Sequence, residues 1–223
     1  IEELPTYSNI LFGLTVIVTI LWFYAATKSR TFLFLIIFRT MLQSILGLKG
    51  FCKDNEMIPP RIMLFGALPA LVAISITFLT NKGRALIDNI NLRTLTYLHT
   101  IRIPVEIVLA LLFHQGLVSV YMIEGTNFDL FSGLTAALVA YIAYRTGTVN
   151  KKLLIGMECP LPVIVVNVVI TAVFTMPSPF HKISLDQPTV AILFFPYNLL
   201  PTVIVLIVLF AHCVAITQLK NGK

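Results

Sequence analysis

The sequence predicts an all-α, polytopic integral membrane protein with seven transmembrane helices, forming a single domain over residues 1–223. Of its 223 residues, 57% are hydrophobic and only 12% are charged, whereas soluble domains carry about 25% charged residues. The mean hydropathy is +0.91. Apolar stretches of about 20 residues, enough to cross a hydrocarbon core of ~30 Å, recur along the chain. A β-barrel is disfavoured, because stretches such as PVIVVNVVITAVF are apolar on every side and do not alternate.

Seven apolar stretches are expected to cross the membrane: Ser8–Ala26, Thr31–Leu48, Arg61–Thr80, Thr94–His114, Leu130–Arg145, Lys152–Phe174 and Thr189–Gln218. The first follows Ile1 closely, without a basic segment or a small-residue cleavage site, so we expect a spanning helix and not a signal peptide. No block of the chain is rich enough in charge to form a separate soluble domain.

The basic residues between the spans predict the orientation. Alternate connections and termini carry ten Lys and Arg residues on one side and four on the other. By the positive-inside rule, the N-terminus lies outside and the C-terminus lies in the cytoplasm. The net charge of +6 is therefore interpreted as a topology signal. We expect the lipid bilayer as the surrounding partner, and no nucleic acid.

The fourth span contains His99, Arg102 and Glu106 on one helix face, inside an otherwise apolar run. A charged side chain at the bilayer centre costs at least ~2.5–3.5 kcal/mol on insertion scales, so it is expected to face a partner, a cavity or a ligand. Arg102 and Glu106 are four residues apart and could form an ion pair within the helix. Pro104 frees the carbonyl of Thr100 and adds an acceptor to the same region.

A second arginine, Arg39, lies near the middle of the second span. Counting Arg39 and Arg102 against Glu106 predicts a surplus of positive charge at mid-depth. Asp129 or Glu124 could balance Arg39. The alternative is an anionic ligand, because guanidinium groups bind oxyanions through two hydrogen bonds.

The fifth span begins with an acidic turn from Glu124 to Asp129, which we expect to cap the helix. Ser132, Ala136 and Ala140 follow at intervals of four residues. Small residues at this spacing let another helix approach closely, so they are interpreted as a packing ridge.

In the last span, Pro196 and Pro201 flank Tyr197 and Asn198, which predicts a kinked or partly unwound helix. Interruptions of this kind line the substrate site in transporters, but proline also occurs in membrane helices whose neighbours repair the gap. Both interpretations stay open.

Cofactor and enzyme patterns are weak. His99 and His212 could face each other across a haem iron or help to bind zinc, but no HExxH pattern is present. The last span has no lysine for retinal, and no GxSxG turn occurs. Cys52, Cys159 and Cys213 are widely spaced and match no disulfide or zinc pattern. We expect no metal or other cofactor, and the sequence does not indicate an enzyme.

Four segments carry a resemblance: PPR (Pro59–Arg61), LHTIRIPVEIVL (Leu98–Leu109), EGTNFDLFSGLTA (Glu124–Ala136) and FPYNLLPTVIVLIVLFAH (Phe195–His212). They resemble signatures of an uncharacterised family of bacterial multi-pass membrane proteins, and the similarity covers nearly the whole chain. The resemblance implies a location in the bacterial inner membrane and supplies no mechanism.

The leading functional hypothesis is binding of a small polar or anionic molecule in an intramembrane cavity, for transport or sensing. The candidate binding residues are Arg102, Glu106, His99, Arg39, Asn198, Tyr197 and Asp129. The first alternative is a structural or accessory subunit of a larger membrane complex, in which partner membrane subunits satisfy the charges. The second is an intramembrane enzyme.

Overall fold

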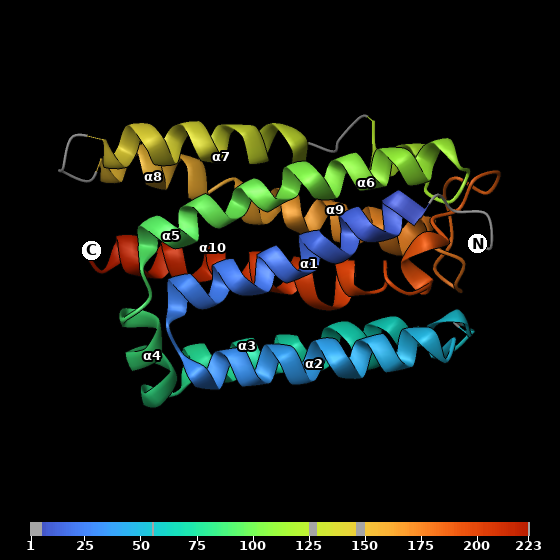
Figure 1. The fold of residues 1–223 in the computed structure, drawn as a ribbon, viewed down its shortest axis with the longest axis horizontal. Coiled ribbons are helices and arrows are strands. Elements are labelled where there is room, and N and C mark those ends of the chain that lie inside the picture. Colours follow the sequence, from blue (N-terminus) through green and yellow to red (C-terminus); the bar gives the residue numbers. More distant parts are fainter. Residues whose placement is uncertain (1–5, 55, 125–128, 146–149, 223) are drawn as a thin grey trace.

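The computed structural model describes residues 6–54, 56–124, 129–145 and 150–222. Within these ranges the chain is helical and forms no strand. Most of the helices lie side by side along the longest dimension of the molecule (Figure 1). Six helical segments of the described residues are long and apolar enough to cross a membrane. The prediction of an all-helical membrane protein is therefore confirmed.

The helices of these six segments are α1 (Thr6–Thr27), α2 (Arg30–Leu48), α3 (Leu68–Leu79), α5 (Leu92–Leu98), α6 (Arg102–His114), α8 (Lys151–Glu158), α9 (Leu161–Thr175) and α10 (Val205–Lys220). Two shorter helices are α4 (Asn81–Asp88) and α7 (Asp129–Tyr144). Segments of π-helix, Ile62–Ala67 and Leu200–Ile204, precede α3 and α10. Short 3-10 turns cover Phe51–Lys53, His99–Ile101, Val120–Met122 and Ala191–Leu193.

Polar N-caps begin the helices at one end of the molecule, the left end in Figure 1. The side chains of Ser29, Thr80, Asn91 and Asn150 each accept a hydrogen bond from the backbone N–H three residues ahead, at 2.9 to 3.4 Å. Such a cap satisfies a backbone donor that the helix leaves open and contributes about 1 kcal/mol. The caps thus fix where the chain re-enters the apolar region.

The predicted bounds of the last span, Thr189–Gln218, are wrong at the N-terminal side. The chain is continuously helical only from Leu200, because Pro196 has no N–H to donate to a helical ladder, whereas Pro201 lies in the first turn of the helix, where proline is tolerated. The segment before it forms turns, and the Thr189 hydroxyl bonds the Thr175 hydroxyl at 2.8 Å. The unwinding expected from the two prolines is confirmed.

The sixth predicted span, Lys152–Phe174, is also interrupted. Helix α8 ends at Glu158 and α9 begins at Leu161, because Pro160 cannot donate a helical hydrogen bond and restrains the residue before it. The fifth predicted span, Leu130–Arg145, corresponds to α7, which has 16 residues. Residues 125–128 of the predicted acidic turn lie outside the described residues.

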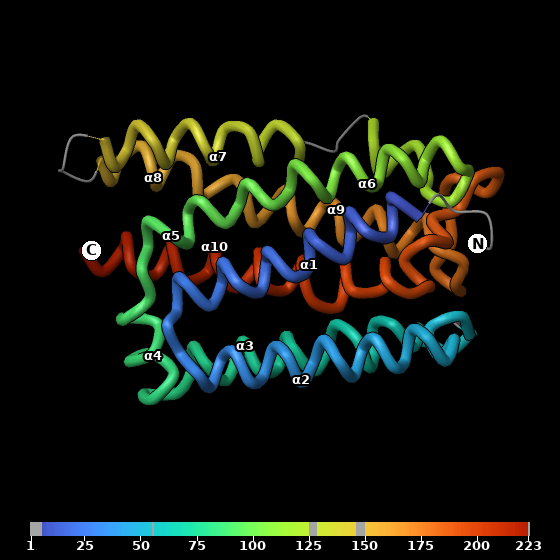
Figure 2. The backbone as a smooth tube through the Cα atoms, viewed as in Figure 1, coloured from blue at the N-terminus to red at the C-terminus, as the bar shows by residue number. Residues whose placement is uncertain are grey.

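The core is built around α10 and the α5–α6 segment. In their most apolar windows, 67% and 61% of the residues are buried, against 11% in α2 and in the segment that contains α3. The backbone trace shows α2 and α3 as a hairpin along one edge of the molecule (Figure 2). Ser132, Ala136 and Ala140 are buried, which confirms that the small-residue ridge packs inside the protein.

Candidate functional site

A connected set of buried polar side chains lies in the interior of the helix bundle. We call it the central polar network, and its members are His99, Arg102, Asp129, Ser132, Glu158 and His212. They come from the α5–α6 segment, α7, α8 and α10. The two histidines are fully buried, and Glu158 and Arg102 are only 1% and 3% exposed. Polar groups at this depth need partners inside the protein.

The 3-10 turn between α5 and α6 positions two members of the network. His99 begins this turn, and Arg102 follows it directly as the first residue of α6. In 3-10 geometry, residues three apart lie on the same side of the helix. Both side chains therefore reach towards α10, where each contacts His212.

Arg102 joins α6 to two other helices. One terminal nitrogen, Nη1, donates to Asp129 at 2.6 Å and to the Ser132 hydroxyl at 2.7 Å. These bonds lead away from Glu106, so the predicted ion pair within the helix is not the principal contact of Arg102. Asp129 and Ser132 reach Arg102 because α7 packs closely against it. Gly133 allows this approach, since a Cβ at this position would lie only 3.2 Å from Cβ of Arg102.

The protonation of His212 follows from its two partners. Nη2 of Arg102 lies 2.8 Å from Nε2 of His212, and Nδ1 of His212 lies 2.6 Å from Oε2 of Glu158. Arginine has no acceptor, so Nε2 must accept and carries no proton. Nδ1 therefore holds the proton and donates it to the carboxylate. His212 is a neutral imidazole held between a guanidinium and a carboxylate.

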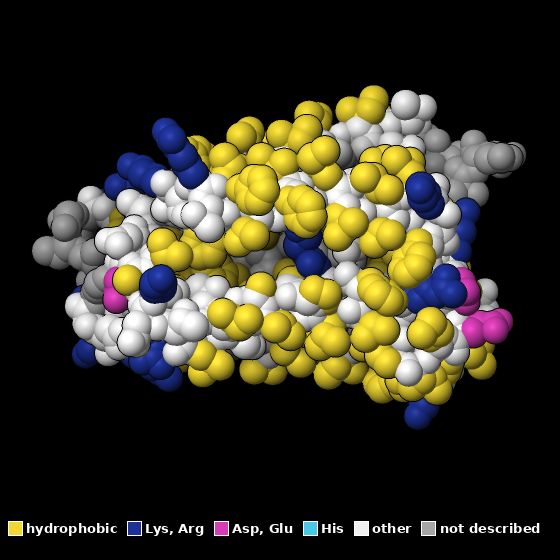
Figure 3. All heavy atoms as spheres, turned by 90° about the horizontal axis from the view of Figure 1, so that it is seen from below, with side chains coloured by type: hydrophobic (Ala, Val, Ile, Leu, Met, Phe, Trp, Pro, Cys, Tyr) yellow, Lys and Arg dark blue, Asp and Glu magenta, His cyan; other side chains and the backbone are white. Residues whose placement is uncertain are grey.

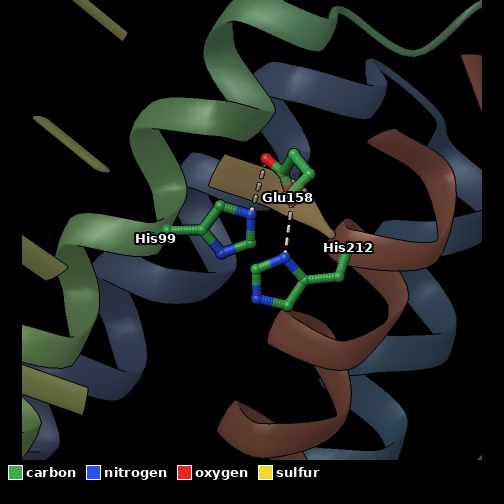
Figure 4. A group of neighbouring side chains, drawn as sticks. All are labelled: His99, Glu158 and His212. Atoms are coloured by element: carbon green, nitrogen blue, oxygen red, sulfur yellow. Dashed lines mark hydrogen bonds and ion pairs between the residues drawn. The ribbon is translucent and has the colours of Figure 1, made fainter. Parts of the chain in front are cut away.

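Glu158 contacts both histidines from one side of the ring pair (Figure 4). Its second oxygen, Oε1, lies 3.6 Å from Nε2 of His99, which is too long for a hydrogen bond. The two imidazole rings are stacked, with centroids 3.9 Å apart and planes 4° from parallel. Among the described residues, neither ring nitrogen of His99 has a hydrogen-bond partner. His99 is thus a member of the network whose ring nitrogens are both left without a hydrogen bond.

The same three residues are of the types that bind metal ions. His99, Glu158 and His212 offer ligand atoms within 4.8 Å of one another, and zinc takes His and Glu ligands at ~2.0–2.2 Å. However, Nδ1 of His212 carries a proton as long as Arg102 donates to Nε2. The stacked rings also direct their in-plane lone pairs side by side, so a metal in the plane of one ring lies outside the plane of the other. The arrangement does not fit a metal ion.

A small cavity of about 40 Å³ lies beside the network, lined by Arg102, Glu106 and Asp129 together with apolar side chains. A site for one water needs roughly 10–15 Å³ by this kind of measure. The cavity therefore has room for about three water molecules beside Arg102.

Sequence reasoning missed Glu158. The residue lies within the predicted span Lys152–Phe174, so the expected surplus of positive charge is wrong: Glu106 and Glu158 match Arg39 and Arg102 in number. The signal was present, because an isolated glutamate in an apolar stretch, two residues before Pro160, is as conspicuous as Glu106.

Three of the predicted site residues, Arg39, Tyr197 and Asn198, lie outside the central polar network. Arg39 donates to the backbone carbonyls of Gly66 and Thr202, so the expected pairing with Asp129 or Glu124 is wrong. Asp129, the first residue of α7, instead forms an ion pair with Arg102.

Tyr197 and Asn198 serve packing of the helices. The Tyr197 hydroxyl donates to Asn9 at 2.7 Å, and the Asn198 amide donates to the backbone carbonyl of Gln43 at 2.8 Å. The two residues tie the turn before α10 to α1 and α2. They are not part of the central polar network.

Comparisons of the chain with protein-family models, with curated protein sequences and with solved structures find no match.

Proposed function

We propose that this membrane protein acts in transport or sensing, and that it works through proton binding at His99 in the central polar network. Ionisable groups within membrane spans mark ion pathways and proton relays. One observation carries the proposal. His99 is fully buried, its ring nitrogens are open among the described residues, and Nε2 lies 3.6 Å from a glutamate oxygen.

The charges around His99 favour uptake of a proton. Arg102 contributes one positive charge, whereas Asp129 and Glu158 contribute two negative charges. His212, between Arg102 and Glu158, is neutral. Glu158 is also the last residue of α8, where the helix dipole is negative. A proton on His99 would balance the excess and turn the 3.6 Å approach into a charge-assisted hydrogen bond.

Glu106 faces the same region from α6 and lines the small cavity with Arg102 and Asp129. A water-sized space next to Glu106 and Asp129 supports proton transfer through water at this side of the network. It offers less support for the wider hypothesis of a small anionic ligand at this point. In this proposal the species that the network binds is the proton.

We further propose that the chain crosses the membrane seven times, with α7 as the additional span. Helix α6 ends at one end of the molecule and α8 begins at the other (Figure 1), so α7 must connect the two ends. The connections between α1 and α2, α3 and α5, and α7 and α8, together with the C-terminus, carry ten Lys and Arg residues, against four on the other side. They support an outside N-terminus, a cytoplasmic C-terminus and, with the resemblance described above, the bacterial inner membrane.

The test is the pH dependence of thermal stability in detergent, from about pH 8 to about pH 5, the range in which imidazole ordinarily changes charge. Because a proton on His99 strengthens its contact with Glu158, the stability of the wild type relative to His99→Gln should increase as the pH falls. The matched control is His114→Gln, which alters an exposed histidine at the end of α6 and should follow the wild type. An unchanged pH dependence in His99→Gln refutes the proposal.

A further inference from the structure

Arg39 lies at the middle of a spanning helix, apart from the central polar network. It is the tenth residue of α2, which has 19 residues. At ~1.5 Å per residue, this places it about 14 Å from either end of the helix, close to the centre of a bilayer. Nε donates to the Thr202 carbonyl at 2.8 Å, and Nη2 donates to the Gly66 carbonyl. The guanidinium is therefore held at mid-depth by backbone groups.

Two π-helical segments form the base of this position. Gly66 belongs to the segment before α3, and Thr202 belongs to the segment before α10. A Cβ on Gly66 would stand 2.5 Å from Cγ2 of Thr202, so only glycine allows this approach. The nearby Gln43 amide donates to the Phe65 carbonyl at 3.0 Å, which joins α2 to the same segment. Packing thus fixes Arg39 where it is.

The charge of Arg39 is not balanced by these contacts. They use two of the five N–H donors of a guanidinium, and both acceptors are neutral carbonyls. Among the described residues, the ion pairs within 4 Å involve other groups and none includes Arg39. A guanidinium in hydrocarbon without an anion is costly. An anionic ligand beside Arg39 would remove this cost.

A cavity of about 320 Å³ lies beside Arg39, between α2, α3 and α10. Its volume is at the lower end of the range of small-molecule sites, ~300–1,000 Å³. Apart from Arg39 and Thr77, the lining side chains are apolar. On the face formed by α2 and α3, Figure 3 shows Lys or Arg atoms in a hollow near the middle, surrounded by hydrophobic side chains. This hollow opens towards the lipid.

The cavity is elongated. Along α2 its lining extends from Phe32 to Leu42, which corresponds to about 15 Å at ~1.5 Å per residue. Arg39 is near one end, and the rings of Phe32 and Phe210 are at the other, with centroids 5.5 Å apart. One cation at one end of an apolar slot matches a molecule with one anionic group and a hydrocarbon chain.

We propose that this cavity binds a long-chain carboxylic acid, with its carboxylate on Arg39 and its chain directed towards Phe32 and Phe210. A carboxylic acid can reach mid-depth in its neutral form and ionise beside the guanidinium, releasing its proton to water. A phospholipid phosphate keeps its charge and stays at the membrane surface. The carboxylate is also the anion that a guanidinium binds through two parallel hydrogen bonds.

A second cavity of the protein provides an internal comparison. It has about 290 Å³, lies between α3, α9 and α10, and is lined by apolar residues without a charged side chain. Uncharged hydrocarbon chains can occupy either cavity, but only the cavity at Arg39 can distinguish a carboxylate from an alcohol of the same length.

The experiment measures binding of dodecanoate and dodecanol to the purified protein in detergent at neutral pH, by native mass spectrometry and by thermal shift. Wild-type protein should bind dodecanoate about tenfold or more tightly than dodecanol, the value of a charge-assisted hydrogen bond. Arg39→Gln should remove this preference. Arg61→Gln, at the exposed pair with Asp54, should retain it, as should His99→Gln.

Because Arg39→Gln also weakens the base of the site, Ala73→Phe provides an independent variant. Ala73 lines the cavity and is exposed, so a phenyl ring there should fill the slot, leave Arg39 in place and reduce dodecanoate binding at least tenfold. Equal binding of acid and alcohol by the wild type overturns the proposal, as does full binding by Ala73→Phe. Co-purification of a membrane subunit whose acidic residue crosslinks to position 39 would also overturn it.

Discussion

Nη2 of Arg102 lies 2.8 Å from Nε2 of His212, and this contact determines the tautomer of His212. It requires an unprotonated Nε2 and hence a proton on Nδ1, which is donated to Oε2 of Glu158 at 2.6 Å. Among the described residues of the network, the atoms without a hydrogen-bond partner are both ring nitrogens of His99, Oε1 of Glu158 and Nε of Arg102.

Loss of Arg102 should destabilise the protein strongly. In Arg102→Ala, Asp129 loses its ion pair and His212 loses its donor. Removal of one partner of a buried ion pair costs about 3–5 kcal/mol. Denaturation in mixed micelles measures the free energy of unfolding. The control is Arg61→Ala, whose pair with Asp54 has side chains 27% and 52% exposed and should cost about 1 kcal/mol or less. Similar losses in the two variants would contradict the role given to Arg102.

Purified protein should contain far less than one metal ion per chain. The reason is the proton on Nδ1 of His212, which prevents His99, Glu158 and His212 from acting together as ligands. Elemental analysis after purification in zinc-supplemented, chelator-free buffer is the measurement. One zinc per chain in the wild type, lost in Glu158→Gln but kept in Glu56→Gln, would show that Arg102 yields its contact to a metal.

Gly66→Ala should destabilise the protein by about 1–3 kcal/mol, the usual cost of overpacking, because the new Cβ would stand 2.5 Å from Cγ2 of Thr202. Thr202→Ser removes that methyl group and keeps the hydroxyl that donates to Asn198 at 2.7 Å. The double variant should therefore regain most of the loss. Gly13→Ala is the matched control, since no atom lies within 4 Å of its added Cβ. Failure of Thr202→Ser to restore stability would argue against this contact.

Much of the fold was predictable from the sequence because apolar length alone predicts a spanning helix. The bounds of the first six predicted spans agree with helical segments of the structure within a few residues. The error is confined to the N-terminal side of the last span, where Pro196 interrupts the helix. The sequence indicates that Pro196 and Pro201 disturb a helix, but it does not indicate that the chain up to Leu199 leaves the helix entirely.

The site was predictable only in part. His99 and Arg102 stand out as polar residues in an apolar run, and their importance could be inferred. Their partners could not, because Asp129 and His212 are brought to Arg102 by the packing of α7 and α10, which no local pattern encodes. Arg39 shows the same limit: its acceptors are backbone carbonyls, and every residue has one.

The most direct test of the central claim is the ¹⁵N spectrum of the histidine side chains of the purified protein, recorded as the pH is lowered from about 8 to about 5 and assigned with His99→Gln and His212→Gln. We predict that His212 stays neutral throughout, with its proton on Nδ1, while His99 gains a second proton. A doubly protonated His212, a proton on its Nε2, or a His99 that stays neutral over the whole range would contradict the account.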